Sequence, residues 1–275
     1  MNDIKARMKS VTGTMQITKA MELVANSKLR RAKEKVEKSR PYYEILRKAI
    51  AKLESSGDFD SPFSKKREGK KSLVITIAGD RGLAGGYNSN VFKLAEKVSG
   101  DSDAIFLPIG KKAVEYFRHR NRNIFTESAL TTADLGVGDC LFLGEAITKA
   151  YLNSDFDKVY VVYTKFVSMI SQLPVYEEIL PFEAEDDEIG AGDILIEEEA
   201  EEMLGRIVPQ YIGGILWSAA CEAIASEHGA RRSAMNAANK NAEEMLDTLM
   251  LKFNRARQAI ITQEITEIVS GAEAL

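Results

Sequence analysis

The chain has 275 residues, of which 45% are hydrophobic and 28% are charged, and its formal net charge is −4. This composition is typical of a folded globular protein, not of a disordered tail or a membrane protein. Because the net charge is small, it predicts attraction neither to nucleic acid nor to membranes. We expect a chain without a signal or transit peptide, since Met1 runs directly into a polar, helix-patterned segment.

Charge is unevenly distributed along the chain. Residues 1–52 carry 14 Lys or Arg against 5 Asp or Glu, whereas residues 183–202 hold 11 acidic residues and no basic one. Two interpretations have equal weight: each segment is a solvated face, or a basic rod meets an acidic partner. The basic run at 28–35 would spread around a helix without aromatic neighbours, which argues against a nucleic-acid site.

The first segment, from Met1 to about Leu53, contains only Gly13 and Pro41 as helix-breaking residues. Its apolar positions alternate in steps of four and three, the pattern of a coiled-coil seam, and only Glu22 and Ser39 break it. A helix of about 80 Å is predicted, and it needs a partner helix to bury its seam. The seam positions are Ile4, Met8, Val11, Met15, Thr18, Ala25, Leu29, Ala32, Val36, Tyr43, Leu46, Ile50 and Leu53.

After a loop at 55–62, the middle of the chain alternates between strand and helix patterns, which predicts a parallel sheet with crossover helices. We expect strands at 72–78, 103–109 and 158–164, a short third strand at 123–126, and edge strands at 175–180 and 193–196. We expect helices at 89–98, 111–118 and 139–152.

The last segment, from about Glu198 to Val269, is predicted to be helical, with an early interruption at Pro209 and the Gly213–Gly214 pair. An apolar stripe then runs at steps of three and four, and we expect it to pair antiparallel with the first helix. The stripe consists of Met235, Ala242, Leu246, Leu249, Phe253, Ala256 and Ile260.

Residue patterns for catalysis and ligand binding are weak. The glycine-rich stretch 79–88 follows a strand and precedes a helix, yet it lacks the Lys-Ser/Thr pair of a P-loop and the spacing of a dinucleotide motif, so a structural turn is favoured. Neither His119 nor His228 has the neighbours of a catalytic or metal-binding set. Cys140 and Cys221 are far apart in the sequence, which favours reduced thiols. We expect no catalytic, cofactor or metal site.

Two long motifs near the ends of the chain carry a family resemblance. Residues 17–28, ITKAMELVANSK, and residues 254–272, NRARQAIITQEITEIVSGA, closely resemble the terminal signatures of gamma subunits of F-type ATP synthases. The middle adds Asp80-Arg81-Gly82-Leu83 and Ser171-Gln172-Leu173-Pro174 in the same order. The match thus extends from one end of the chain to the other.

The resemblance implies an α/β fold with two parts. Residues 1–55 and 205–275 would form a long antiparallel coiled coil that serves as a shaft, and residues 70–200 a central Rossmann-like domain. The implied function is that of a non-catalytic rotor, with no cofactor, that couples rotation of a membrane ring of c subunits to ATP synthesis or hydrolysis at the beta subunits. The implied partners are the alpha and beta subunits, the epsilon subunit and the c-ring. The location would be the cytoplasmic face of the bacterial cell membrane, reached only through the complex.

The motifs also suggest partner-contact residues. Met21 and Lys28 match the shaft segment that faces acidic loops of the beta subunits in the family. Arg257, Gln258, Thr262 and Glu264 match a second contact segment, where polar side chains can form hydrogen bonds that depend on the rotor angle. For Ile260, Ile261, Ile265 and Ile268, packing within the chain and a hydrophobic bearing are equally open.

Two other functions compete with this interpretation. A dinucleotide-dependent enzyme would use the middle sheet, but the missing motif and the missing acid–base pair argue against it. A coiled-coil tether without rotation would share the heptads but not the C-terminal motif.

Overall fold

The computed structural model describes residues 1–55, 61–65, 67, 69, 71–100, 103–126, 130–182 and 200–273. The chain folds into two compact units: a helical unit, Met1–Asn26 with Arg231–Leu275, and a sheet unit, Ser27–Ala230. Both terminal helices contribute residues to both units, because α1 spans Asn2–Ser55 and α5 spans Ala200–Glu273. From the sequence we expected each long helix to belong wholly to the shaft, with residues 1–55 and 205–275 in one part and 70–200 in the other. These domain bounds stay a prediction.

The long first helix predicted from the heptad pattern is confirmed as α1, which continues through Pro41. Seam positions from Ala25 to Val36 are buried, and those from Ile4 to Thr18 are half-buried. Ser39 keeps its seam position although it is polar, since its buried hydroxyl donates to the Val36 carbonyl at 3.1 Å. The side chains of Tyr43 and Leu53 lie outside the described part.

The predicted interruption of the last helix is wrong. The helix α5 continues through Pro209 and the Gly213–Gly214 pair without a break. Proline costs a helix one backbone hydrogen bond and crowds the carbonyl four residues earlier. Here that cost is offset by burial, because Val208, Ile212 and Leu216 around the proline are completely buried.

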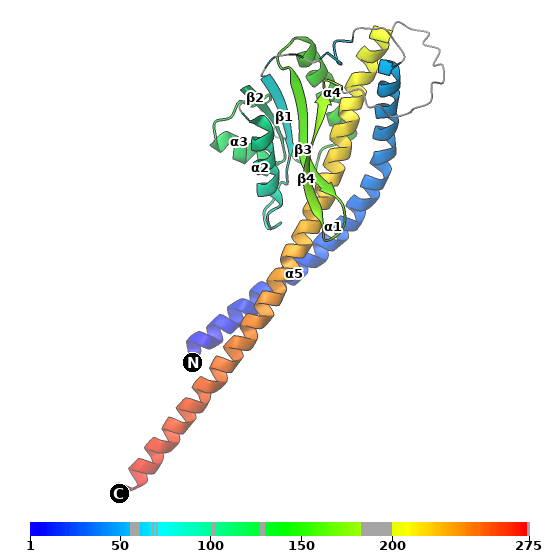
Figure 1. Cartoon of the computed structure of the whole chain (residues 1–275). Coiled ribbons are helices and arrows are strands. Elements are labelled where there is room, and N and C mark those ends of the chain that lie inside the picture. Colours follow the sequence, from blue (N-terminus) through cyan, green and yellow to red (C-terminus); the bar gives the residue numbers. More distant parts are fainter. Residues whose placement is uncertain are drawn as a thin grey trace. The chain divides into compact units, whose positions relative to one another are not determined.

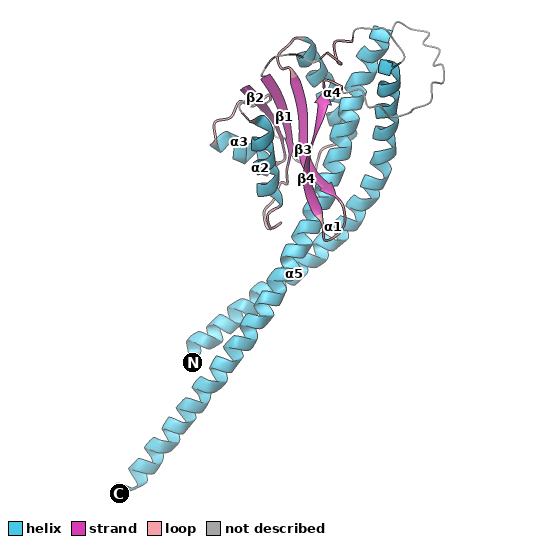
Figure 2. Ribbon diagram, viewed as in Figure 1, coloured by secondary structure: helices cyan, strands magenta, loops and turns pink. Residues whose placement is uncertain are grey.

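The sheet has four strands in the order β2-β1-β3-β4. The strands β2 and β3 both pair parallel with β1, and β4 pairs antiparallel with β3 at the edge (Figure 2). The predicted strands and the edge strand near 175–180 are therefore confirmed. Their bounds are β1 Lys71–Ile77, β2 Asp103–Ile109, β3 Lys158–Phe166 and β4 Gln172–Leu180.

The short third strand expected at 123–126 is only a single parallel bridge between Ile124 and Phe106. The Phe106 N–H donates to Asn123 O, and the Phe125 N–H donates to Phe106 O, both at 2.8 Å. The other expected edge strand, at 193–196, and most of the expected loop at 55–62 lie outside the described residues.

Helices cover both faces of the sheet in the Rossmann-like arrangement that we expected (Figure 1). On one face, Val74 of β1 and Phe106 of β2 join the buried side chains of α2 (Tyr87–Ser99) and α3 (Lys111–His119). On the other face, β1 side chains such as Ile75 pack with α4 (Val137–Leu152) and with the first turns of α5.

Glycine allows α4 and α5 to approach very closely within the sheet unit. A Cβ at Gly144 would lie 2.2 Å from the Pro209 carbonyl oxygen, and one at Gly213 would lie 3.0 Å from the Cys140 carbonyl oxygen. The first distance is one that real Cβ atoms essentially never show, and the second is tighter than nine in ten real Cβ contacts. Gly213, one of the pair that suggested a helix break, therefore serves helix–helix contact instead.

Candidate interaction surface of the terminal helices

The helical unit is an antiparallel pair of helices. The Lys5 ammonium lies 6.0 Å from the centre of the Phe253 ring, and the Lys19 ammonium lies 3.3 Å from a carboxylate oxygen of Glu243. Residue numbers thus rise along α1 while those of their partners fall along α5. This confirms the predicted antiparallel pairing of the two terminal helices.

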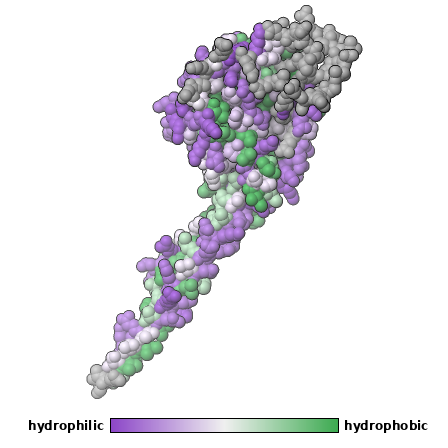
Figure 3. Space-filling view, viewed as in Figure 1, coloured by the Kyte–Doolittle hydropathy of each residue, from purple (hydrophilic) through white to green (hydrophobic). Residues whose placement is uncertain are grey.

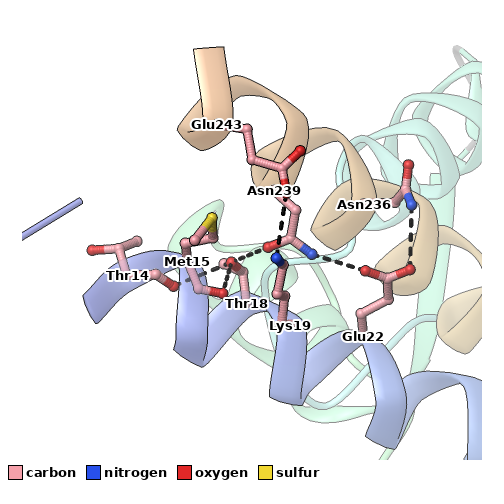
Figure 4. A network of polar contacts seen from close by, with 8 residues as sticks. All are labelled: Thr14, Met15, Thr18, Lys19, Glu22, Asn236, Asn239 and Glu243. Atoms are coloured by element: carbon pink, nitrogen blue, oxygen red, sulfur yellow. Dashed lines mark hydrogen bonds and ion pairs between the residues drawn. The ribbon is translucent and has the colours of Figure 1, made fainter. Parts of the chain in front are cut away.

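A layer of polar side chains interrupts the apolar seam of this pair (Figure 4). The Thr18 hydroxyl donates to Asn239 Oδ1 at 2.5 Å, and Asn239 Nδ2 donates to Glu22 Oε2 at 2.8 Å. Asn236 Nδ2 donates to the other Glu22 oxygen at 3.3 Å. We call Thr18, Glu22, Asn236 and Asn239 the polar layer. Glu22, which breaks the heptad pattern in the sequence, is therefore paired at its seam position rather than expelled from it.

The predicted contact residues occupy different environments. Met21 is half-buried on α1, and Lys28, which belongs to the sheet unit, is exposed. Arg257, Gln258, Thr262 and Glu264 are all exposed on α5. The Thr262 hydroxyl donates to the Gln258 carbonyl at 2.9 Å, one turn earlier in the same helix. The structure thus gathers four of the six residues on one exposed helical segment.

The end of α5 is a single helix in the described part of the helical unit. Lys5, near the N-terminal end of α1, lies level with Phe253 of α5. The helix α1 therefore does not extend beyond this point, and it leaves the α5 residues after Ala256 uncovered. The predicted stripe is confirmed as far as Ala256, but Ile260 is 39% exposed. Figure 3 shows apolar residues at the surface near this end. The exposed apolar residues are Ile260, Ile261, Ile265, Ile268 and Val269.

Several exposed apolar residues of the helical unit escaped the sequence analysis. On α1, Leu23 and Val24 are 71% and 55% exposed, next to half-buried Met21. On α5, Leu251 is 62% exposed. Their signal in the sequence is that they are large apolar residues lying off the seam positions, where a solvated helix would carry polar ones.

The glycine-rich stretch after β1 is organised by Asp80 within the sheet unit. One carboxylate oxygen of Asp80 accepts the Lys111 N–H at 3.0 Å and the Thr132 N–H at 3.2 Å, and the other accepts the Ala133 N–H at 3.0 Å. Asp80 therefore places its negative charge at the start of α3, where a helix favours an anion. This geometry supports the structural-turn interpretation of the stretch.

Both cysteines lie in the core of the sheet unit as free thiols. Burial raises the pKa of Cys140 to about 12, and burial raises the pKa of Cys221 to about 11. Their thiols are thus protonated at neutral pH and poor nucleophiles. Among the described residues, no group of three His, Cys, Asp or Glu side chains could hold a metal ion.

Known proteins match this chain along its whole length. The family model described as ATP synthase matches residues 1–275. The ATP synthase gamma chain of Ruminococcus albus is 43% identical over 280 residues, which cover 99% of this chain and 97% of the relative. A gamma chain of Acetobacterium woodii named as sodium ion specific is 40% identical over 295 residues, covering 99% of this chain and 98% of the relative.

Solved structures share the fold. A chain of the Euglena gracilis mitochondrial ATP synthase, in the OSCP/F1/c-ring part in rotational state 3, has a TM-score of 0.71 at 18% identity, covering 99% of this chain and 93% of that chain. A chain of the rotor of the same enzyme in rotational state 1 has a TM-score of 0.63 at 17% identity, covering 94% of this chain and 98% of that chain. The family resemblance of the terminal motifs is confirmed: this chain belongs to the ATP synthase family, as a gamma chain.

Proposed function

We propose that this chain is the central-stalk rotor subunit of an F-type ATP synthase. It would couple rotation of a c-ring to conformational change at the catalytic beta subunits. A gamma chain is a stalk subunit and not the catalytic one. The observation that carries the proposal is the 43% identity to a gamma chain over 99% of this chain.

The proposed mechanism depends on an asymmetric cross-section. The helical unit has two helices side by side as far as Ala256, and a single exposed helix beyond it. When such a shaft turns inside a ring of alpha and beta subunits, each beta subunit meets a different side of it. Different contacts stabilise different conformations, so one rotor angle can hold three identical sites in three states.

Torque transmission requires that the two helices turn together. The Lys19–Glu243 ion pair and the polar layer link α1 to α5 across the seam. The ion pair is exposed on both sides, at 52% and 56%, and such pairs contribute little stability, about 0–1 kcal/mol. The hydrogen bonds to the buried Asn239 side chain are therefore the stronger polar link between the helices.

The contact residues belong to the same proposal. Met21 would present an apolar side chain to the acidic loops of beta, with Lys28 as a nearby positive charge in the sequence. Arg257, Gln258, Thr262 and Glu264 would form changing hydrogen bonds and ion pairs with the surrounding ring. Their exposure on α5 supports this role, since these side chains lie where a partner can reach them.

The proposed location is the cytoplasmic face of the bacterial cell membrane. The epsilon subunit and the c-ring would hold the chain there, because none of the described helices combines the length and the apolar character that crossing a membrane requires.

Reconstitution with the alpha and beta subunits tests the proposed function. The full chain, mixed with both subunits, should elute with them as one complex and raise ATP hydrolysis above that of alpha and beta alone. A bead attached to the sheet unit of surface-fixed complexes should rotate in one direction while ATP is hydrolysed. A chain that elutes alone, or a bead that does not turn in an active complex, contradicts the proposal.

A further inference from the structure

We infer that Glu22 and Asn239, together with Thr18, are positioning residues that select one pairing of α1 with α5 in the helical unit. The effect of that pairing on ATP hydrolysis rests on the proposed function, whereas the pairing itself does not. None of these residues needs to touch a partner subunit. They would act by fixing which side chains of α1 lie level with which side chains of α5.

The polar layer lies between apolar parts of the seam. Asn239 is only 6% exposed, yet both ends of its side-chain amide are paired: Oδ1 accepts from Thr18, and Nδ2 donates to Glu22. The second Glu22 oxygen accepts from Asn236. A carboxylate can only accept, and an amide must present its oxygen to one partner and its nitrogen to the other. The donors and acceptors therefore match in this pairing.

Other pairings along the same seam leave at least one of these groups unmatched. If α1 moved by seven residues in one direction, Asn239 would face Val11 and Met15, which offer no side-chain partner. Moved by seven in the other direction, Glu22 would face Glu243 and Leu246. Apolar seam residues tolerate such changes, because Met, Val and Leu can replace one another in a contact. A buried polar residue at one seam position thus selects the register at a cost in stability.

The selected pairing also fixes the surface that the two helices present together. Met21, Leu23 and Val24 flank Glu22 on α1, and a shift by seven residues would move them about 10 Å along α5 while they face the same way. The four predicted contacts on α5 lie further along the helix that carries Asn239. If the helices sampled several pairings, a given rotor angle would present several surfaces to the beta subunits. Coupling would then weaken although every contact residue is intact.

Disulfide mapping on the full chain tests the pairing directly. Val11 lies seven residues before Thr18 on α1, and Leu246 lies seven residues after Asn239 on α5. In an antiparallel pair these two positions face each other, so Val11→Cys with Leu246→Cys reports the observed pairing. Val11→Cys with Phe253→Cys reports a pairing shifted by seven residues. Cys140→Ala and Cys221→Ala remove the native thiols, and thermal unfolding verifies that this background folds.

The layer is then changed in two ways. Glu22→Leu with Asn239→Leu, called the apolar variant, replaces its two central members with apolar residues, and Glu22→Gln keeps an oxygen that accepts from the asparagine amides. The Val11–Phe253 pair uses no residue of the polar layer, so it reports slippage in every variant. We expect the apolar variant to unfold at an equal or higher temperature, and its ratio of Val11–Leu246 to Val11–Phe253 cross-links to fall several-fold. Glu22→Gln should keep the original ratio.

In the complex with alpha and beta, the apolar variant, with its native cysteines, should hydrolyse ATP more slowly despite its stability, and Glu22→Gln should not. If the layer only stabilised the helix pair, the apolar variant would be less stable and would still cross-link at Val11–Leu246. Cross-links at that pair alone in the apolar variant would overturn the inference. If the chain does not join alpha and beta at all, the proposed function is contradicted. The cross-links of the isolated chain would still show whether the polar layer selects the helix pairing.

Discussion

The carbonyl oxygen of Pro209 on α5 lies 2.2 Å from the place where a Cβ on Gly144 of α4 would stand. Real Cβ atoms essentially never approach so closely, and backbone cannot swing aside like a flexible side chain. Gly144→Ala should therefore push the two helices apart and destabilise the sheet unit by about 1–3 kcal/mol. Urea unfolding of the full chain, followed by far-UV circular dichroism, measures the loss.

A matched control is available in the same helix. Gly138 also belongs to α4, but a Cβ there would meet nothing within 4 Å. Gly138→Ala should be neutral or slightly stabilising, since alanine favours the helix more than glycine. Equal effects of the two substitutions would mean that the close approach of α4 and α5 is not what requires glycine.

Asp80 supports a second prediction, because its carboxylate accepts three backbone N–H groups from two other segments. Asp80→Ala leaves these donors without their partner and should cost about 1–3 kcal/mol. Asp80→Asn, which keeps one acceptor oxygen, should cost less. Thermal unfolding distinguishes the two, with Asp155→Ala at an exposed position as control. An Asp80→Ala variant as stable as the control would show that the turn is held by other contacts.

The buried thiols should make the native chain inert to thiol reagents. Cys140 and Cys221 have pKa values raised from 9.0 to about 12 and about 11, because burial disfavours the thiolate. At pH 8 the folded chain should react with a chromogenic disulfide only slowly, and in urea both thiols should react quickly. Rapid reaction of the folded chain would contradict the burial of these side chains.

The same shift has a consequence for stability at high pH. Above pH 9 the unfolded chain loses the thiol protons while the folded chain retains them, so the unfolded state is favoured as pH rises. The free energy of unfolding should therefore fall between about pH 9 and pH 12, the range that the two shifts span. Replacing both cysteines by alanine should reduce that fall, which equilibrium unfolding at a series of pH values measures.

The sequence predicted α1 and the apolar stripe because a seam repeats at steps that only a helix can bring to one side. It marked Glu22 as a break in the seam but predicted no polar layer there. The partners of Glu22 could not be predicted, because Asn239 is 217 residues away and the register of the two helices depends on packing that no local pattern contains. For the same reason the stripe was expected to include Ile260, which lies beyond the point where α1 covers α5.

The interruption at Pro209 was mispredicted for a different reason. Local rules weigh proline and glycine by their cost in an isolated helix. In the folded chain, the buried side chains around Pro209 and the close approach at Gly144 and Gly213 outweigh that cost. Gly213, which disfavours a helix locally, is here a residue that permits a tertiary contact.

Gln258 allows a test of the proposed contacts on α5. Its side chain is exposed, so Gln258→Ala should leave the stability of the chain unchanged. In the complex with alpha and beta, loss of a hydrogen bond of about 0.5–1.5 kcal/mol should lower the hydrolysis rate about two- to tenfold. Lys252→Ala, at another exposed position of α5, should not. Equal rates for both variants would argue against a contact at Gln258.

Met21 allows a test of the proposed contacts on α1, where a half-buried apolar side chain would slide past acidic loops of beta. Met21→Lys adds a positive charge that should attract those loops, so turnover in the complex should slow or uncouple from rotation. Met21→Leu keeps the apolar character and should behave as the unchanged chain. Attraction between exposed charges weakens with salt, so raising the ionic strength should partly restore coupling in Met21→Lys. Coupling equal to that of the unchanged chain at low salt would remove Met21 from the contact surface, and a defect that salt does not relieve would point to altered packing instead of charge.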